Sequence, residues 1–243
     1  MGFKSSGSIE YDMLFEDLKD NYLQYYPFVG ENYKKAKEKI LIVGESHYAE
    51  NTKESEEIHK HQNLTRAVIN DKGINRDYRK TKTFTNFHKA IFTNDTFDSQ
   101  KFWDLLAFYN FVQRPMFSSK HRPIFKDFTD GWQTFFKVIE IIKPTSIIFI
   151  GVKASDFLQN AISTSEYSLQ NYKWDEKISR TYPRKGTLVS KENISTQVLF
   201  MQHSGHHFSH AKWNNYLQKH LGQKLDWLKQ NVESTTYNNG YKT

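Results

Sequence analysis

Four short apolar runs, separated by segments of helical spacing, constrain the fold of this chain more than any other feature. They cover residues 39–44, 102–112, 146–151 and 196–202. The first and third runs are rich in β-branched residues and end on a glycine, a pattern typical of buried strands in a parallel sheet. Because strands and helices alternate, we expect an α/β fold in which helices cover both faces of the sheet. The prediction is a three-layer α/β/α sandwich around a central, mostly parallel four-stranded sheet.

Helices are predicted where apolar residues recur at i, i+3, i+4 and i+7. These segments are residues 11–26, 84–92, 132–142, 154–161 and 213–228. The first stops before Pro27 and the third before Pro144, because proline cannot continue a helix. Ser209 is the expected N-cap of the last helix.

The remaining segments carry weaker patterns. Residues 51–82 are polar and charged, so we expect a flexible insertion there. Residues 165–195 are irregular, with a possible hairpin around residues 184–186. We expect one domain over residues 1–233, followed by a disordered tail at 234–243.

Composition narrows the class of protein. The 243 residues are 37% hydrophobic and 16% aromatic, enough to fill a core, and contain no cysteine. The lack of cysteine excludes disulfides, thiolate zinc sites, iron–sulfur clusters and a cysteine nucleophile. No run of 18 apolar residues is present, and the N-terminus lacks the order of a signal peptide, so we expect a cytoplasmic protein without a membrane partner.

The net charge of +7 favours a polyanionic partner such as DNA. Basic residues gather in two stretches, Arg76, Arg79, Lys80 and Lys82, and then Lys120, Arg122 and Lys126. An ordinary solvated surface would explain these residues equally well.

The ends of the predicted strands locate a candidate site. In open α/β sheets, ligands bind beyond the carboxyl ends of the strands. That rule selects residues 45–48, Asn110, residues 151–155 and residues 203–208. Because neighbouring strands lie about 4.8 Å apart, polar groups at these ends can share one pocket.

Three of these strand ends carry motifs that resemble the uracil-DNA glycosylase superfamily. The motifs are Gly44-Glu-Ser-His-Tyr48, Phe108-Tyr-Asn-Phe-Val-Gln-Arg-Pro115 and Gln202-His-Ser-Gly205. They occur in the family's order within residues 38–225. The resemblance implies an enzyme that binds DNA containing uracil or another damaged base and hydrolyses its N-glycosidic bond, with neither a cofactor nor a metal.

The resemblance also implies roles for individual residues. Asn110 would read the N3–H and O4 edge of uracil, and His203 would stabilise negative charge on the departing base. Tyr48 would exclude the 5-methyl group of thymine, and Phe84 or Phe87 would stack on the base. Ordinary structural roles remain open for these residues, including loop capping by Asn110 and core packing by the phenylalanines.

One departure from the family concerns catalysis. The water-activating Asp of relatives with a Gly-Gln-Asp-Pro-Tyr loop falls on Ser46, and their Pro falls on His47. Serine is no general base at neutral pH, so Glu45, which other branches share, is the candidate for positioning water. The branches with that loop that bind an iron–sulfur cluster use four cysteines, and this chain has none, so it would be a divergent, cluster-free member.

The segment after the last strand is the predicted contact with DNA. Ser204, Gly205, His207 and Phe208 are the predicted DNA-binding residues, and residues 206–208 occupy the place where relatives insert a side chain into the duplex. His207 or Phe208 would be the wedge that fills the gap left by the flipped nucleotide. The alternative for Phe208 is a hydrophobic staple under the last helix.

Two other functions remain open. One is a metal-dependent hydrolase whose imidazole and carboxylate ligands would come from Glu45, His47, His203, His206, His207 and His210. The loop at residues 44–47 also resembles the Gly-Glu-X-His loop of erythromycin-esterase-like and haem-handling proteins. The second is a catalytically inactive DNA-binding module of the same fold, which the serine at position 46 motivates.

Overall fold

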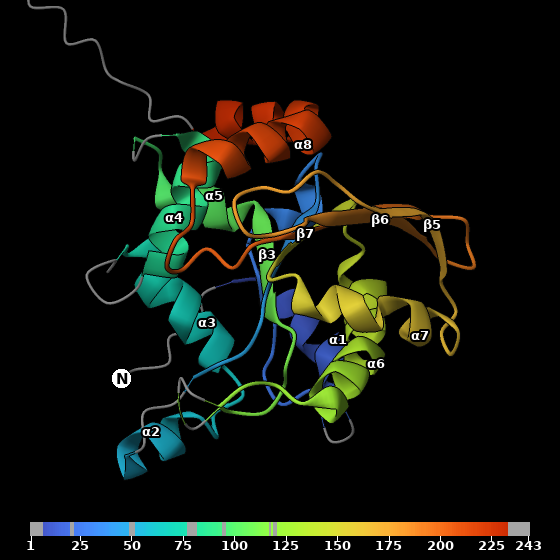
Figure 1. Ribbon diagram of the computed structural model, residues 1–243. Helices are drawn as coiled ribbons and strands as arrows, with labels where there is room; N and C mark the ends of the chain where they lie inside the picture. The colour runs from blue at the N-terminus through green and yellow to red at the C-terminus, as the bar shows by residue number, and fades with distance from the viewer. Residues whose placement is uncertain are drawn as a thin grey trace, which may run out of the picture.

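A seven-stranded mixed sheet forms the centre of the molecule in the computed structural model, which describes residues 7–19, 22–48, 52–76, 82–93, 96–116, 118 and 121–232 (Figure 1). The strand order is β1-β3-β2-β4-β7-β6-β5. The strands are β1 (Phe28–Val29), β2 (Ile40–Gly44), β3 (Leu106–Asn110), β4 (Ser146–Ile150), β5 (Ser168–Trp174), β6 (Arg184–Val189) and β7 (Ser195–Met201).

The four predicted strands correspond to β2, β3, β4 and β7, which pair with one another in parallel. Ile40 of β2 lies between Leu106 of β3 and Ser146 of β4, and Ser146 pairs in turn with Gln197 of β7. The α/β class is therefore confirmed. The prediction of four strands was wrong, because β1, β6 and β5 extend the sheet by antiparallel pairing.

Sequence patterns missed the added strands for physical reasons. β1 has only two residues, too few for any period, and β5 is mostly exposed, so it lacks an apolar face. Residues 184–186 were expected in a hairpin turn but lie inside β6, opposite Phe200–Val198. Arg184 is buried there because its guanidinium stacks 3.7 Å from the centre of the Trp174 ring and bonds to Asp156.

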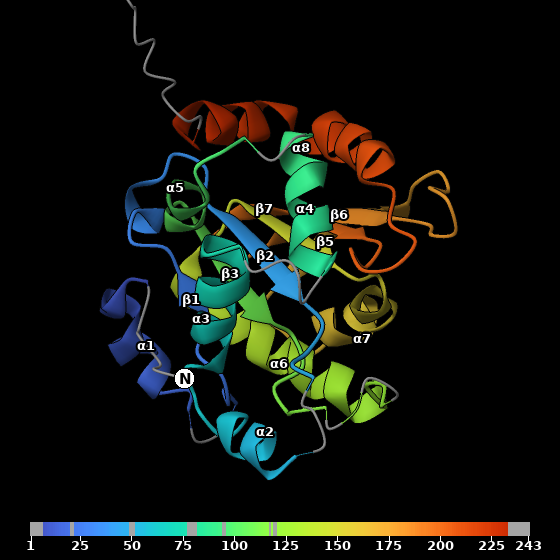
Figure 2. The ribbon, with the colours of Figure 1, turned by 90° about the vertical axis from the view of Figure 1, so that its left-hand side faces the viewer.

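Helices cover both faces of the sheet, with α1, α6 and α7 on one side and α4, α5 and α8 on the other (Figures 1 and 2). The side chains of β2 alternate between these layers, as a strand requires: Leu41 and Val43 face the first, and Ile40 and Ile42 face the second. The α-helices are α1 (Asp12–Glu16), α2 (Lys53–Ile58), α3 (Leu64–Val68), α4 (Lys82–Phe92), α5 (Ser99–Asp104), α6 (Phe125–Ile142), α7 (Leu158–Ile162) and α8 (His210–Val232). Shorter turns are the 3₁₀ helices η1 (Ile9–Tyr11), η2 (Tyr33–Lys35) and η4 (Lys153–Phe157), and the π-helix η3 (Ile69–Ile74).

Two predicted element boundaries are corrected. The strand predicted over residues 102–112 begins at Leu106, because Asp98 caps a helix by accepting a hydrogen bond from the Lys101 N–H. The N-terminal helix predicted over residues 11–26 ends at Glu16. The rest of that segment instead buries Leu23, Tyr25 and Tyr26 without continuing the helix.

The segment predicted to be a flexible insertion is largely structured. Residues 52–76 form α2, α3 and η3 in sequence. Thr52 caps α2 through the Ser55 N–H, and the buried Arg66 of α3 ties the segment to Asp12 and to the Pro27 carbonyl. Residues 77–81 and the predicted tail at 234–243 lie outside the described residues.

His88 of α4 is a buried ionisable residue in the second layer. Its ring lies among Phe97, Phe102 and Trp103, with ring-centre distances of 5.1, 5.4 and 5.9 Å. Within the part of the chain that the structure describes, neither ring nitrogen has a hydrogen-bond partner. Burial, helped by the positive charge of Arg76, lowers the pKa of His88 to about 3.

Replacing His88 by Phe should stabilise the fold, and more at pH 5 than at pH 7.5. The unfolded chain binds a proton at His88 near pH 6.5 and the folded chain only near pH 3, so the natural protein loses stability as the pH falls between these values. His88→Phe should raise the free energy of unfolding by about 2 kcal/mol more at pH 5 than at pH 7.5. Urea unfolding at both pH values measures this, with the exposed His121→Phe as the control. Equal gains at both pH values would contradict the account.

Candidate functional site

A cavity of about 650 Å³ opens at the carboxyl ends of the parallel strands. It lies at the switch point of the sheet, where the chain leaves β2 for β3 on one side and later returns to β4 on the other. Its lining includes Gly44–Tyr48 after β2, Asn110 at the end of β3, Ile150 of β4 and His203 after β7. The structure thus brings Glu45, Tyr48, Phe84, Asn110 and His203 to one cavity.

Backbone hydrogen bonds join the loops that follow β2 and β3. The N–H of Phe111 donates to the Gly44 carbonyl at 3.0 Å, and the N–H of Val112 donates to the Glu45 carbonyl at 2.8 Å. Further along, the N–H of Met116 donates to the His47 carbonyl at 2.9 Å. These bonds continue the ladder beyond the strands, so the two loops hold a fixed position relative to each other.

An ion pair anchors the second loop to α6. Arg114 bonds to both carboxylate oxygens of Asp127, at 2.5 and 2.6 Å, and Asp127 also accepts from the Ile124 N–H at 2.7 Å. Burial acts to raise the pKa of Asp127, but the bonds from Arg114 and from the Ile124 N–H outweigh it and lower the pKa. The charged carboxylate therefore secures the loop that starts at Asn110.

Asn110 is buried against the floor of the cavity, with only 5% of its surface exposed. Asn110 pairs with Gly44 in the parallel register of β2 and β3, and its carboxamide lies over the glycine. A Cβ atom at position 44 would come within 2.3 Å of Asn110 Oδ1. Gly44 is therefore required by this close approach.

His47 lies in the site, although the glycosylase resemblance gave it no role and the sequence suggested it only as a metal ligand. Its Nε2 lies 2.9 Å from Asn110 Nδ2 and 2.9 Å from Thr65 Oγ1, and the ring packs edge-on against Tyr25. Burial, with smaller effects from His59 and Lys72, lowers the pKa of His47 to about 3. The ring is therefore neutral at physiological pH. The sequence signal for a special role of His47 was that it stands where related glycosylases have a proline.

Glu45 and Tyr48 interact at the mouth of the cavity. The Tyr48 hydroxyl donates to Glu45 Oε2 at 3.1 Å, and Arg122 Nη1 lies 3.4 Å from the Tyr48 hydroxyl oxygen and 4.0 Å from Glu45 Oε2. Burial and the nearby Glu45 carboxylate raise the pKa of Tyr48, so it stays a neutral donor. Ser46 Oγ is buried and has no hydrogen-bond partner among the described residues.

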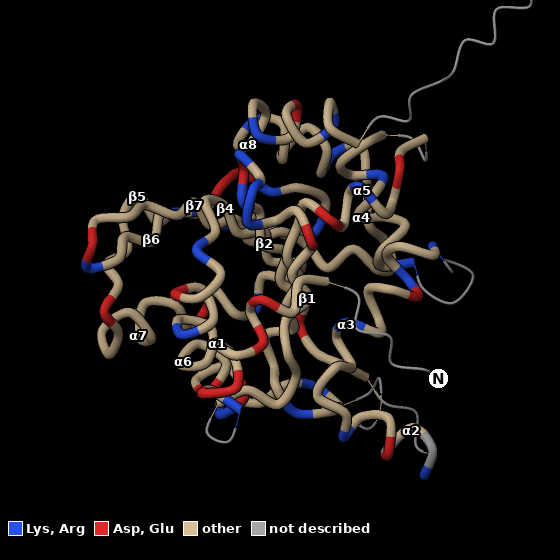
Figure 3. The backbone as a smooth tube through the Cα atoms, turned by 180° about the vertical axis from the view of Figure 1, so that it is seen from behind, with Lys and Arg blue, Asp and Glu red and all other residues tan. Residues whose placement is uncertain are grey.

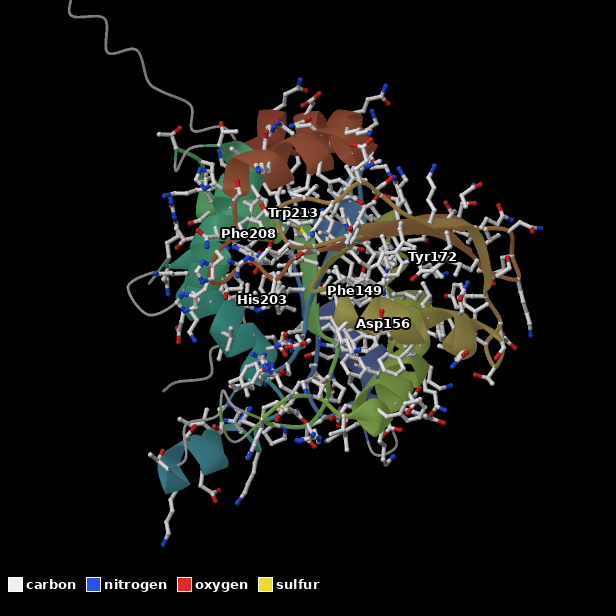
Figure 4. All side chains as sticks on the ribbon, in the orientation of Figure 1. Phe149, Asp156, Tyr172, His203, Phe208 and Trp213 are labelled. Carbon is white, nitrogen blue, oxygen red and sulfur yellow. The ribbon has the colours of Figure 1, made fainter. Side chains whose placement is uncertain are left out.

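His203, labelled in Figure 4, lines the cavity and is exposed in part. The N–H of Gly205 donates to His203 Nδ1 at 3.1 Å. Burial lowers the pKa of His203, opposed by Glu45 and assisted by Arg122, so the ring is neutral at pH 7. With Nδ1 acting as an acceptor, the single ring proton resides on Nε2, which is left as a hydrogen-bond donor.

Phe84 forms an apolar wall of the cavity. Its ring contacts Trp103 and Phe108, with centres 5.9 and 5.8 Å away, and 7% of the residue is exposed. Phe87, the alternative stacking residue, is buried in the core and is absent from the described lining of the cavity. Of the two phenylalanines predicted to stack on a base, Phe84 therefore lines the cavity and Phe87 does not.

The loop after β7 is tied to α4 by polar contacts. The buried Ser204 hydroxyl donates to the Thr83 carbonyl at 2.9 Å, and Asn86 Nδ2 donates to the carbonyls of Ser204 and Gly205 at 2.8 and 2.9 Å. Ser204 therefore positions the loop, while Gly205 positions the His203 ring through its N–H.

Phe208 forms the hydrophobic staple of α8. Its ring lies parallel to that of Trp213, with centres 6.1 Å apart, and the two labelled side chains adjoin in Figure 4. The Ser209 carbonyl accepts from the Trp213 N–H, so Ser209 takes the N-cap position and the two rings take positions N′ and N4. His207 is exposed and has a left-handed backbone, with φ of 56°. The contact of His207 or Phe208 with DNA stays a prediction.

The segment at residues 52–72 supplies a wall of the cavity that sequence patterns did not reveal. The lining residues from this segment are Thr52, Ser55, Ile58, His59, Leu64, Ala67, Val68, Asp71 and Lys72. Asp71 and Lys72 belong to the π-helix η3, a distortion that occurs often at functional sites. Among the described lining residues, the carboxylates are Glu45 and Asp71. The polar composition and the absence of a helical period concealed this wall.

In the backbone view of Figure 3, the described Lys and Arg positions are interspersed with Asp and Glu positions and form no single stripe. Of the two basic stretches, Arg76, Lys82, Arg122 and Lys126 are described, whereas Arg79, Lys80 and Lys120 lie outside the described residues. Among the helices that the structure describes, none is both long and apolar enough to cross a membrane.

The histidines considered as metal ligands do not gather. Within the described residues, no three His, Asp or Glu side chains lie close enough together to hold a metal ion. His203 bonds to Gly205 and His47 to Asn110, and His206 and His207 are exposed.

Comparison with protein-family models gave no match for this sequence, and comparison with curated proteins gave none either.

Replacing Arg114 by Gln should lower the free energy of unfolding by about 1 kcal/mol at pH 7, because the Arg114 guanidinium is half exposed and partly screened. The folded state holds the pKa of Asp127 below its unfolded value, so this stabilisation is present above about pH 4 and is lost as the pH falls through the folded pKa. The loss in free energy of unfolding caused by Arg114→Gln should therefore be constant from pH 5 to 8 and should shrink at lower pH. Urea unfolding of both proteins measures it.

The matched control is Lys126→Gln, which removes the exposed Lys126–Asp130 pair. We expect at most a few tenths of a kcal/mol from it. If the two variants lose the same free energy of unfolding, Arg114 does not anchor the loop to α6.

Proposed function

We propose that this chain is a divergent, cluster-free uracil-DNA glycosylase that hydrolyses the N-glycosidic bond of a flipped uracil or related damaged base in DNA. The observation that carries the proposal is that Glu45, Asn110 and His203, from the ends of three different strands, line one cavity. This arrangement supports assigning the α/β fold to the three-layer, uracil-DNA glycosylase-like type. The excess of positive charge favours DNA as the partner.

Recognition of the base rests on Asn110, Phe84 and Tyr48. The Asn110 carboxamide offers an acceptor for N3–H and a donor for O4, a pairing that suits uracil and not cytosine. The Phe84 ring offers an apolar face for the base, and Tyr48 at the mouth occupies the space that a thymine 5-methyl group would need. Tyr48 is held there by its bond to Glu45.

Stabilisation of the leaving base rests on His203. When the bond between C1′ and N1 breaks, the electron pair stays on the base, whose negative charge spreads to O2. The sugar gains oxocarbenium character at the same time. The neutral His203 donates from Nε2 to O2 without losing its proton, because the Gly205 N–H holds the ring in that tautomer.

A carboxylate completes the hydrolysis. Water adds to C1′, its oxygen forms the new bond, and its proton passes to a carboxylate of the cavity and then to solvent. Ser46 does not accept a proton at neutral pH. Glu45 is the first candidate, because its carboxylate lies at the cavity mouth beside Tyr48. Asp71 is the second, and among the described residues its carboxylate makes no hydrogen bond or ion pair.

Contact with the duplex is assigned to the loop after β7. His207 at its exposed turn is better placed for insertion than Phe208, which packs on Trp213. Gly205 and Ser204 support this loop through Asn86 and Thr83.

Incubation with single-lesion oligonucleotides tests the proposal. The chelator-treated protein should produce alkali-labile abasic sites at the uracil position of single- or double-stranded oligonucleotides and none in thymine controls. Asn110→Ala and His203→Ala should each lower the rate by about 10²-fold or more, because each removes a bond to the base that strengthens in the transition state. The exposed His210→Gln is the control and should keep the natural rate.

Other outcomes would replace the proposal. No cleavage of uracil, hydroxymethyluracil, hypoxanthine or other deaminated purines, together with salt-sensitive DNA binding, would identify an inactive DNA-binding module. Cleavage that disappears after treatment with chelator would identify a metal-dependent hydrolase.

Separate substitution of the two carboxylates should identify the general base. Glu45→Gln should lower the single-turnover rate by about 10²–10⁴-fold while DNA binding persists, because the amide cannot take the proton of water. Asp71→Asn should change the rate by less than about tenfold if Glu45 is the base. The reverse pattern in single-turnover kinetics would move the role to Asp71.

A further inference from the structure

We propose that His47 is a specificity-determining residue: it fixes the direction of the Asn110 carboxamide and thereby selects a uracil edge over a cytosine edge. This inference rests on the proposed function of the cavity. His47 contacts Asn110 and acts on the base through it, so it is a positioning residue.

The contact is direct and buried. His47 Nε2 lies 2.9 Å from Asn110 Nδ2, and each residue is only 5% exposed. Thr65 of α3 places its hydroxyl 2.9 Å from the same nitrogen. The carboxamide therefore meets a buried partner that is itself held by Thr65.

The chemistry of this contact determines where the ring proton resides. The Asn110 Nδ2 group has only hydrogens to offer, so His47 Nε2 must accept. The Thr65 hydroxyl can rotate and donate to the same nitrogen. A neutral imidazole carries one proton, which is then on Nδ1.

This direction leaves a defined pattern for the ligand. One N–H of Asn110 donates to His47. Oδ1 lies over Gly44, and it has room there because residue 44 carries no side chain. The acceptor Oδ1 and the second N–H match N3–H and O4 of uracil. Cytosine needs a donor opposite N3 and an acceptor opposite its amino group, so it would leave the buried carboxamide unpaired.

The surroundings keep the His47 ring in place. Tyr25 packs edge-on with ring centres 4.8 Å apart, and the Met116 N–H holds the His47 carbonyl. Among the described residues, the groups that face the imidazole are Asn110, Thr65, Tyr25, His59 and Lys72, and none of these is an acidic side chain. Burial and the two basic neighbours keep the ring unprotonated well below pH 7, so the selectivity should not change between pH 5 and 8.

Binding of free bases to the full chain tests the inference without requiring catalysis. Titration calorimetry with uracil and cytosine gives the ratio of their dissociation constants. The natural protein should prefer uracil by about 100-fold, and His47→Phe, which keeps the ring packing but removes the acceptor, should reduce this ratio at least about tenfold. His47→Gln restores a carbonyl acceptor and should recover part of it. The exposed His210→Gln should leave the ratio unchanged.

The outcomes separate the inference from the function on which it rests. If the natural protein prefers uracil and folded His47→Phe shows the same ratio, His47 does not set selectivity and the inference fails alone. If the natural protein binds no uracil and excises none, the proposed function fails and this inference fails with it.

A spectroscopic readout covers the case in which His47→Phe does not fold. In the natural protein, ¹⁵N NMR of the histidine rings should show His47 protonated on Nδ1 and unprotonated on Nε2 from pH 5 to 8. The His47 resonances are assigned by their absence in His47→Gln. A proton on Nε2 would mean that Asn110 turns Oδ1, and not Nδ2, toward His47, which would overturn the inference.

Discussion

The parallel pairing of β2 with β3 on one side and β4 on the other is the constraint on which the rest of the structure depends. Because Gly44 pairs with Asn110 in this register, the last residue of each strand faces the same cavity. The loops beyond them stay in contact through the bonds of Phe111 and Val112 to the first loop. The reversal of strand order at β2 opens the space that these loops enclose.

Much of this arrangement was predictable from the sequence. The parallel strands were found because burial on both faces demands continuous apolar runs, as in Ile40–Gly44. β5 and β6 were missed because pairing with a neighbouring strand, and not a local pattern, holds them in the sheet. Tertiary contacts likewise order residues 52–76, where the buried Arg66 pairs with Asp12, and composition gives no sign of such a distant pair.

The candidate site divides along the same line. Glu45, Tyr48, Asn110 and His203 were predictable because they directly follow or end strands, and the cavity brings them together. The roles of the surrounding residues required three-dimensional packing: His47 turns inward to Asn110, and Asp71 arrives on a π-helix from a segment without a period. Phe208 shows the opposite case, since capping rules anticipated its packing on Trp213 as an alternative to insertion. Across the site, neutral histidines bonded to defined partners hold the polar groups in fixed directions.

The account's central claim is that this cavity takes up an extruded pyrimidine. A crystal structure of the protein with an oligonucleotide that carries one uracil on a cleavage-resistant 2′-fluorinated sugar tests it most directly. The account predicts the base outside the helical stack, with N3 and O4 within hydrogen-bond distance of Asn110 and O2 facing His203 Nε2. A complex in which the uracil stays stacked, or in which the DNA occupies a surface away from the cavity, would contradict it.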